Sequence, residues 1–209
     1  MGKYDACEHL MNILQQKGIH QSEVLAAMRT IDREDFVNSQ DKIHAYEDRP
    51  LSIGCQQTIS QPYIVAKMTS LLLNEKVKLN KVIEIGTGSG YQAAILSCLT
   101  TQVYSIERIS ALYQMAKKRL ASYKNVQVFL SDQCKVLSQY GPFDGILVTA
   151  CCWQIEQDWL QALTDGGCLV LPLTVHYYQQ LIRVIRSKDQ YIHEYWDMVR
   201  FVALKKGVI

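Results

Sequence analysis

The chain has 209 residues, of which 48% are hydrophobic and 20% charged, so it can bury the core of one globular domain. Its 22 Lys and Arg residues nearly balance 20 Asp and Glu residues, and the net charge of +2 excludes a polybasic nucleic-acid arm and an acidic tail. The seven Cys residues are odd in number and lack CxxC spacing, and the five His residues are scattered, which argues against a disulfide framework and a structural zinc site.

Targeting and membrane signals are not found in the sequence. No apolar run approaches the roughly 18 residues that a transmembrane helix needs. The first ten residues, MGKYDACEHL, lack the apolar stretch of a signal peptide. Together with the Cys pattern, which indicates reduced thiols, these features predict a cytoplasmic protein without a membrane partner.

The predicted elements begin with two helices. Apolar residues at helical spacing predict helices over residues 4–16 and 21–29, and Ser22 is a candidate cap for the second. Residues 30–61 are irregular and polar, and so long a loop in a compact domain is usually functional or contains short elements. A third helix is predicted over residues 62–74.

Strands and helices then alternate. Strands are predicted over residues 81–86, 103–107, 126–132, 143–150 and 168–173, and helices over residues 91–99, 110–122 and 156–163. This alternation indicates a parallel sheet covered on both faces. Residues 179–187 and 190–204 lack an intervening helix and alternate partly with a period of two, so they predict an antiparallel pair at the sheet edge. The fold class expected is therefore α/β, with a mostly parallel, doubly wound sheet, an antiparallel edge pair and N-terminal helices.

A glycine-rich turn, residues 86–90 (GTGSG), lies between a predicted strand and a predicted helix. Glycine permits positive φ and close approach of the backbone to a ligand, and this context is typical of nucleotide-binding βαβ units. The spacing is G-x-G-x-G rather than the dinucleotide pattern G-x-G-x-x-G. That difference argues against a pyrophosphate seated on the helix N-terminus.

Three acidic residues end successive predicted strands: Glu84, Glu107 and Asp132. Ligands of open α/β sheets lie at the carboxyl ends of the strands. Glu107 is placed to accept hydrogen bonds from a ribose diol, Asp132 to accept from an adenine amino group, and Glu84 to face a positive amine or sulfonium. One such acid is often only a cap of the following helix. Three beside this turn favour a site for S-adenosylmethionine, with NAD as the alternative.

At these residues the sequence resembles protein-L-isoaspartate O-methyltransferases. The resemblance is carried by IGCQQTISQPY at residues 53–63, VIEIGTGSGYQAA at 82–94, YSIER at 104–108, PFD at 142–144, VTA at 148–150, GGCLVLP at 166–172 and VRFVAL at 199–204. It extends from about residue 22 to the C-terminus. Many methyltransferases share the glycine-rich turn, whereas QTISQP is specific to this family.

The resemblance implies a Rossmann-like class I fold and transfer of a methyl group from S-adenosylmethionine to the free carboxylate of L-isoaspartyl residues in damaged proteins. The products would be S-adenosylhomocysteine and an ester that cyclises to a succinimide, which starts repair. No metal is implied. The partners expected are isoaspartyl proteins or peptides, not nucleic acid, and the protein is expected to be a monomer.

The resemblance also implies roles for individual residues. It assigns Ser60 to catalysis and places Ile59, Ser60 and Thr149 on the substrate side. The cofactor side would comprise Gln57, Thr58, Glu84, Gly86, Thr87, Gly88, Gly90, Glu107, Asp132 and Gln133. We expect one domain over residues 1–209, in which residues 1–61 contain the N-terminal helices and the active-site loop, 62–175 the cofactor-binding core and 176–209 the closing strands.

The chemistry implied needs little catalytic machinery. A carboxylate is ionised at neutral pH and a sulfonium is already activated, so the enzyme mainly aligns the reactants and excludes water. A hydroxyl such as that of Ser60 can orient the carboxylate without acting as a nucleophile. From the residues alone, Thr58 and Ser60 are better interpreted as helix caps before Pro62. Only the resemblance favours the catalytic role.

Some segments depart from the family pattern. Residues 131–133 read SDQ where GDG is usual, residues 151–156 read CCWQIE where small residues and then Ile-Pro are usual, and Ala203 replaces a usual Pro. We expect Cys151 and Cys152 to be buried and Trp153 to cover the sheet end.

Two alternatives therefore stay open. The first is a methyltransferase of the same fold with an altered substrate or lost activity. The second, less favoured, is a nucleic-acid methyltransferase. The sequence TACC at residues 149–152, where adenine amino methyltransferases have Asn/Asp-Pro-Pro-aromatic, and the low net charge both argue against it.

Overall fold

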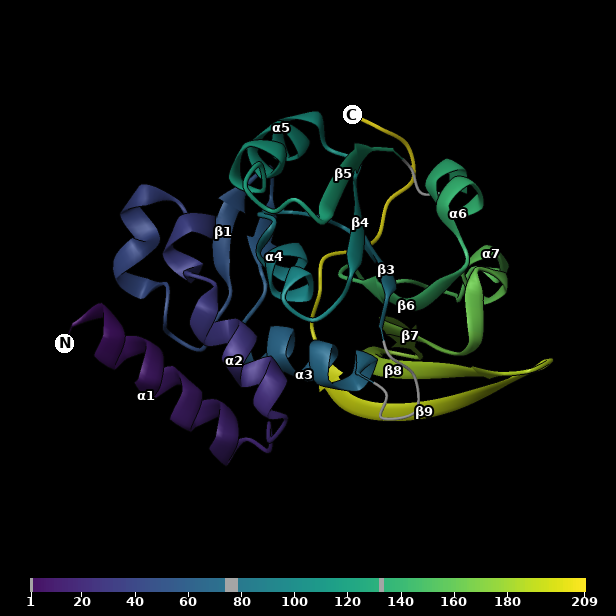
Figure 1. Ribbon diagram of the computed structural model, residues 1–209, viewed down its shortest axis with the longest axis horizontal. Coiled ribbons are helices and arrows are strands. Elements are labelled where there is room, and N and C mark those ends of the chain that lie inside the picture. The colour runs from purple at the N-terminus through teal and green to yellow at the C-terminus, as the bar shows by residue number, and fades with distance from the viewer. Residues whose placement is uncertain (1, 74–78, 132–133) are drawn as a thin grey trace.

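The computed structural model describes residues 2–73, 79–131 and 134–209 and has a central seven-stranded sheet (Figure 1). Its strands are β3 (Lys81–Ile85), β4 (Gln102–Glu107), β5 (Val126–Leu130), β6 (Phe143–Val148), β7 (Leu163–Val175), β8 (Tyr178–Ser187) and β9 (Gln190–Val199). Their order across the sheet is β5-β4-β3-β6-β7-β8-β9. The first five strands in this order pair in parallel, and β8 and β9 add antiparallel pairs at one edge. The predicted sheet is confirmed.

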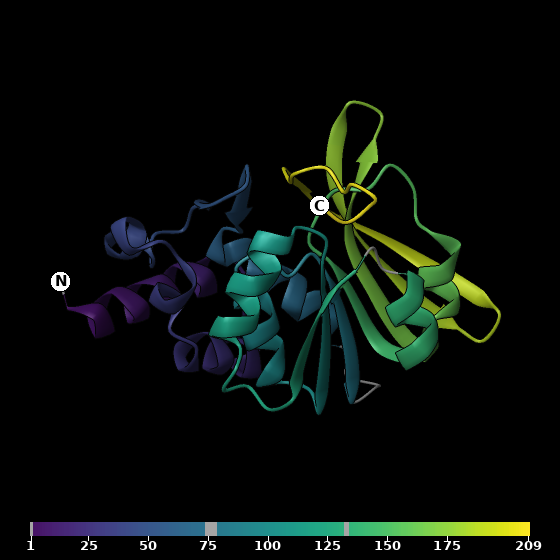
Figure 2. The ribbon, with the colours of Figure 1, turned by 90° about the horizontal axis from the view of Figure 1, so that it is seen from above.

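Helices cover both faces of this sheet. They are α1 (Lys3–Gln16), α2 (Ser22–Thr30), α3 (Pro62–Leu72), α4 (Tyr91–Ser97), α5 (Ser110–Arg119), α6 (Cys134–Tyr140) and α7 (Gln157–Gln161). Figure 2 shows α3, α4 and α5 with the N-terminal helices on one side and α6 and α7 on the other. No helix in the described ranges is long and apolar enough to cross a membrane.

Two hydrophobic clusters follow from the alternation of side chains along the strands. Val82, Val103, Leu147 and Val170 pack with the N-terminal helices and with α3, α4 and α5. Their neighbours Ile83, Tyr104, Ile146 and Leu169 pack with Val136 of α6 and Trp159 of α7. Because both of their faces are buried, the central strands β6 and β7 contain continuous apolar runs.

The loop over residues 30–61 contains short elements that the sequence did not reveal. They are the 3-10 helices η1 (Arg33–Phe36) and η2 (Ser39–His44), and the hairpin of β1 (Leu51–Gly54) and β2 (Gln57–Ile59). Helix α6 was also not predicted, and β7 begins at Leu163 rather than at residue 168. The cap predicted at Ser22 is wrong, because Ser22 is the first helical residue and its hydroxyl bonds Glu23.

Candidate active site

A cavity of about 490 Å³ opens at the carboxyl ends of β3, β4 and β6. Of the residues predicted for the site, Gln57, Thr58, Gly86, Gly88, Glu107 and Thr149 line it. A smaller cavity of about 40 Å³ is lined by Thr58, Ile59, Ser60, Glu84, Gly86, Thr87, Gly88 and Thr149. The two cavities share Thr58, Gly86, Gly88 and Thr149, so the QTIS segment and the glycine-rich turn meet at one place.

The glycine-rich turn adopts a backbone that only glycine tolerates well. Gly86, Gly88 and Gly90 have φ values of 103°, 54° and 92°. A Cβ on Gly86 would overlap Oγ1 of Thr149, which lies 2.6 Å from the carbonyl oxygen of Gly86 and 3.0 Å from that of Ile85. Since the Thr149 hydroxyl donates to these carbonyls, it holds the turn and offers no donor to a carboxylate in this geometry.

Glu107 closes the other side of the turn. Its Oε2 accepts from the Gly88 N–H at 2.8 Å, and its Oε1 accepts from the N–H groups of Arg108 and Ile109, both at 2.9 Å. A carboxylate has about four acceptor positions, so three are filled by backbone and one is left for a ligand. The expected diol contact is therefore limited to one further hydrogen bond in this geometry.

Glu84 is fully buried beside the smaller cavity. Its Oε2 accepts from Ser105 Oγ at 2.5 Å, and that hydroxyl lies 2.6 Å from Thr87 Oγ1. Its Oε1 has no hydrogen-bond partner within the described ranges. Burial raises the pKa of Glu84 to about 8, the Ser105 hydrogen bond opposes that rise, and the charge of Glu107 adds to it. The carboxyl group is thus mostly protonated at neutral pH.

Ser60 does not cap α3. The N-cap residue is Gln61, which makes no capping bond, and Pro62 at the first position has no N–H. The first free amide is that of Tyr63, and Asp48 Oδ1 accepts from it at 2.8 Å. The capping interpretation of Thr58 and Ser60 is therefore wrong.

The backbone of Ser60 is held by a side chain from the N-terminal part of the chain. Its carbonyl oxygen accepts from Nη2 of Arg33 at 2.7 Å. No hydrogen bond of the Ser60 hydroxyl is formed to the parts of the chain that the structure describes. Ile59 is buried and pairs with Leu51 across the β1–β2 hairpin, so the hairpin fixes the approach of this segment to the cavity.

Three residues predicted for the cofactor side remain: Gly90, Asp132 and Gln133. Gly90 directly precedes α4. Asp132 and Gln133 lie outside the described residues, although their neighbour Ser131 lines the larger cavity and donates its N–H to the Glu107 carbonyl at 3.0 Å.

The C-terminal segment also lines the larger cavity, and sequence reasoning did not assign it there. Val202, Ala203, Leu204, Lys205 and Ile209 contribute to the wall. The Cys151 N–H donates to the Val202 carbonyl and the Leu204 N–H donates to the Cys151 carbonyl, both at 2.8 Å. Residues about 50 positions apart are thus paired, and no local pattern signals such a pairing.

Of the expectations for residues 151–153, which depart from the family pattern, one is confirmed and one is wrong. Cys151 and Cys152 are buried, as expected, and burial raises the pKa of the Cys152 thiol to about 12. Trp153 is 78% exposed, so the expectation that it covers the sheet end is wrong. The two Cys backbones bridge the C-terminal segment and β7.

Comparison with solved structures defines the fold. A structure described as a putative protein-L-isoaspartate O-methyltransferase from Plasmodium falciparum in complex with S-adenosyl-L-homocysteine matches with a TM-score of 0.84 and 24% identity, over 95% of this chain and 98% of that one. Another, a protein-L-isoaspartate O-methyltransferase, matches with a TM-score of 0.83 and 24% identity, over 97% of this chain and 67% of that one. The fold is therefore the class I methyltransferase fold.

Sequence comparison identifies the family. The profile of the protein-L-isoaspartate(D-aspartate) O-methyltransferase family matches residues 5–208. Curated relatives named protein-L-isoaspartate O-methyltransferase include one from Pseudomonas aeruginosa strain LESB58, 43% identical over 97% of this chain and 96% of the relative. Another, from Methanospirillum hungatei, is 46% identical over 91% of this chain and 88% of the relative. The chain belongs to the protein-L-isoaspartate(D-aspartate) O-methyltransferase family.

Proposed function

We propose that this protein transfers a methyl group from S-adenosylmethionine to the free carboxylate of L-isoaspartyl residues in polypeptides. The observation that carries the proposal is the meeting of the QTIS segment and the glycine-rich turn at two adjoining cavities, in a chain that matches the family over residues 5–208. Relatives bearing this enzyme name are 43–46% identical.

The residues of the cavities fit the cofactor. The unpartnered Oε1 of Glu84 suits an ammonium group, and the remaining acceptor position of Glu107 suits a ribose hydroxyl. We propose that these two acids act with Gln57, Thr58, Gly86, Thr87, Gly88 and Gly90, and with Asp132 and Gln133 beyond the described residues. The cofactor supplies a methyl group activated by its sulfonium sulfur.

The side chains that face the substrate have a positioning task. We propose that Ser60 donates its hydroxyl hydrogen to the isoaspartyl carboxylate, and that buried Ile59 shapes the adjoining wall. No histidine in the described ranges lines either cavity. A general base is not needed because the carboxylate is ionised at neutral pH, so alignment and exclusion of water are the main contributions of the chain.

We also propose the domain organisation, oligomeric state, partners and location of the protein. We infer that the 209 residues act as one domain and one monomer, on isoaspartyl polypeptides rather than nucleic acid. The N-terminal helices and the sheet share one hydrophobic cluster, which supports a single domain. A cytoplasmic location is proposed from the odd number of Cys residues.

The experiment uses methyl-labelled S-adenosylmethionine and two peptides that differ only in one isoaspartyl or aspartyl residue. We expect a base-labile methyl ester on the isoaspartyl peptide alone. Equal labelling of both peptides would contradict the proposed substrate. No labelling of either, with cofactor binding seen by calorimetry, would favour a same-fold methyltransferase with altered substrate or lost activity.

A further inference from the structure

Arg33 is a fully buried cation at the start of η1. Among the described residues it forms no ion pair, and its Nε and Nη1 have no hydrogen-bond partner. The carboxylate of the preceding Asp32 is directed elsewhere, since it accepts from the Glu34 N–H and the Tyr46 hydroxyl and pairs with Lys3. A buried charge without a paired carboxylate is costly, so the presence of Arg33 here calls for an explanation.

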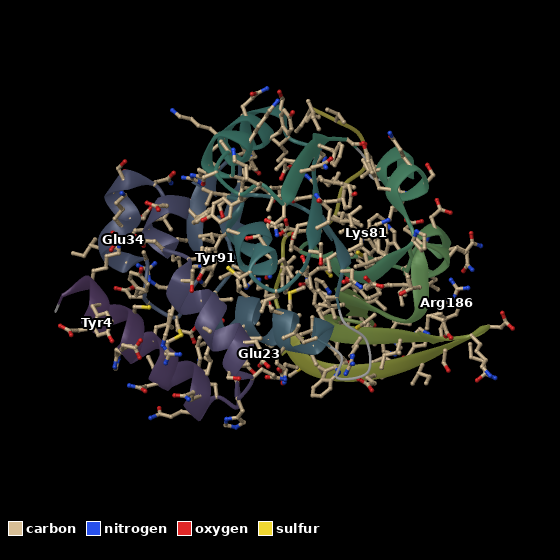
Figure 3. All side chains as sticks on the ribbon, viewed as in Figure 1. Tyr4, Glu23, Glu34, Lys81, Tyr91 and Arg186 are labelled. Carbon is tan, nitrogen blue, oxygen red and sulfur yellow. The ribbon has the colours of Figure 1, made fainter. Side chains whose placement is uncertain are left out.

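Two contacts of the guanidinium lead to the candidate site. Nη2 donates to the Ser60 carbonyl oxygen at 2.7 Å. The guanidinium carbon lies 4.9 Å from the centre of the Tyr91 ring, a distance at which a cation and an aromatic face attract. Tyr91 begins α4 directly after Gly90 and lines the smaller cavity with Ser60 and Glu84. Figure 3 labels Tyr91 near helix α4, in the view of Figure 1.

Arg33 therefore joins the segment that carries Ser60 to the end of the glycine-rich turn. The Ser60 hydroxyl makes no hydrogen bond to the described parts of the chain, so its direction depends on how the backbone is held. The hydrogen bond to the Ser60 carbonyl fixes that peptide plane. Burial lowers the pKa of Arg33 from its usual value, but a guanidinium stays protonated in proteins, so the contact persists across the working pH range.

We propose that Arg33 is a positioning residue for methyl transfer: it holds the Ser60 backbone against the start of α4 and so aligns the Ser60 hydroxyl with the cofactor turn. This inference deepens the proposed function and rests on it for the role of Ser60. It requires that loss of the guanidinium disturb the Ser60 segment more than it disturbs the fold or cofactor binding.

The first variant is Arg33→Met, which keeps an unbranched buried side chain and removes the charge. The variant removes the cost of burying an unpaired charge but also removes the donor to the Ser60 carbonyl oxygen. These effects oppose each other, so we expect Tm to change little. We expect kcat for an isoaspartyl peptide to fall about ten-fold or more, since small misplacements of reacting groups have effects of this order. The Kd for S-adenosylhomocysteine should change less than about three-fold, because Arg33 touches the turn only through Tyr91. An unchanged kcat would overturn the proposal.

The matched control is Phe36→Leu. Phe36 lies on the same 3-10 helix, is buried, and has its ring 5.5 Å from the Tyr91 ring. A smaller side chain there should lower Tm through a packing defect and leave kcat unchanged. Equal loss of kcat in Phe36→Leu and Arg33→Met would overturn the proposal, because a general packing defect under Tyr91 would then explain both. If Arg33→Met does not fold, Arg33→Lys replaces it, since Lys keeps the charge and loses the planar fork.

Two further measurements separate this inference from the proposed function. Because Arg33 acts through Ser60, the Arg33→Met/Ser60→Ala double variant should have a kcat close to that of Ser60→Ala alone, and additive losses would contradict the mechanism. Amide hydrogen exchange over residues 57–63, measured without cofactor or substrate, should accelerate in Arg33→Met and not in Phe36→Leu. Unchanged exchange would overturn the inference about Arg33, whether or not the protein methylates isoaspartyl peptides. A wild type that leaves isoaspartyl peptides unmethylated would refute only the proposed function.

Discussion

Glu84 and Ser105 are paired in register on neighbouring parallel strands, and the Ser105 hydroxyl donates to the buried carboxyl group of Glu84 at 2.5 Å. Burial nevertheless dominates and raises the pKa of Glu84 from 4.5 to about 8. The folded protein thus retains a proton that the unfolded chain releases near pH 4.5. The stability contributed by this group is complete below pH 4.5 and is lost as the pH rises through about 8.

A Glu84→Gln variant tests this linkage. Because Gln stays neutral at all pH values, the free energy of unfolding of the variant should not show the decline with rising pH that Glu84 causes in the wild type. We expect the stability of the wild type to fall relative to the variant between pH 5 and pH 8, by up to about 1.4 kcal/mol per pH unit. Urea unfolding at several pH values measures the difference. Parallel stability profiles for the two proteins would contradict the raised pKa.

Cofactor binding should release a proton from the same group. An ammonium group beside Glu84 favours the ionised carboxylate, because a nearby opposite charge lowers the pKa of an acid. At pH 7 we expect S-adenosylhomocysteine binding to release close to one more proton from the wild type than from Glu84→Gln. Calorimetry in buffers of different ionisation enthalpy counts these protons. Equal counts in the two proteins would show that Glu84 does not face the ammonium.

Gly86 should be intolerant of any side chain. Its φ of 103° is strained for other residues, and a Cβ would also overlap Oγ1 of Thr149. Gly86→Ala should therefore lose about 2 kcal/mol of stability or more, together with cofactor binding. Gly18→Ala is the matched control, because Gly18 has a φ of 90° and open space around the added Cβ. It should cost about 1 kcal/mol and retain binding.

A double variant identifies the cause of the Gly86 effect. Thr149→Ala removes the overlapping hydroxyl, so Gly86→Ala/Thr149→Ala should recover the part of the stability loss that comes from overlap and not the part from φ. Thermal unfolding and calorimetric titration of S-adenosylhomocysteine measure both. If Thr149→Ala rescues nothing, the overlap is not what makes Gly86 necessary.

The sequence predicted those parts of the site that local patterns encode. The strand, glycine-rich turn and helix around Gly86 were expected because apolar runs and glycines occur within a few residues of one another. Helix α6 was missed because, unlike the equally short α4, which is buried from Tyr91 to Leu96, it has described buried side chains only at Val136 and Leu137. Two such positions give little periodicity to detect.

Contacts between segments far apart in the sequence could not be predicted from local patterns. Arg33 reaches Ser60 across 27 positions, and Cys151 pairs with Val202 near the C-terminus. Hydrophobic periodicity carries no information about which polar groups meet after folding. The same limit explains the cap of α3, which the sequence suggested at Ser60 and which comes from Asp48, 15 positions before the amide that it accepts from.

Asp48 should therefore be needed for the geometry around Ser60. Its Oδ1 accepts from the Tyr63 N–H, and its Oδ2 accepts from Gln61 Nε2 at 2.9 Å and from Lys17 Nζ at 2.6 Å. Asp48→Ala removes the cap of α3 and should reduce stability by about 2 kcal/mol. Asp48→Asn keeps a capping oxygen, so it should lose less. Chemical unfolding of each variant gives the order.

Lys17→Ala separates the cap from the ion pair. The Lys17 side chain is 44% exposed and that of Asp48 is 9% exposed. Because solvent around Lys17 screens the pair, we expect it to contribute about 1 kcal/mol or less. We expect Lys17→Ala to leave the methylation of isoaspartyl peptides unchanged. Asp48→Ala should lower kcat as well as stability, because its partners Gln61 and Tyr63 lie one and three positions after Ser60. Equal losses of stability in Lys17→Ala and Asp48→Ala would assign the effect of Asp48 to its charge and not to the helix cap.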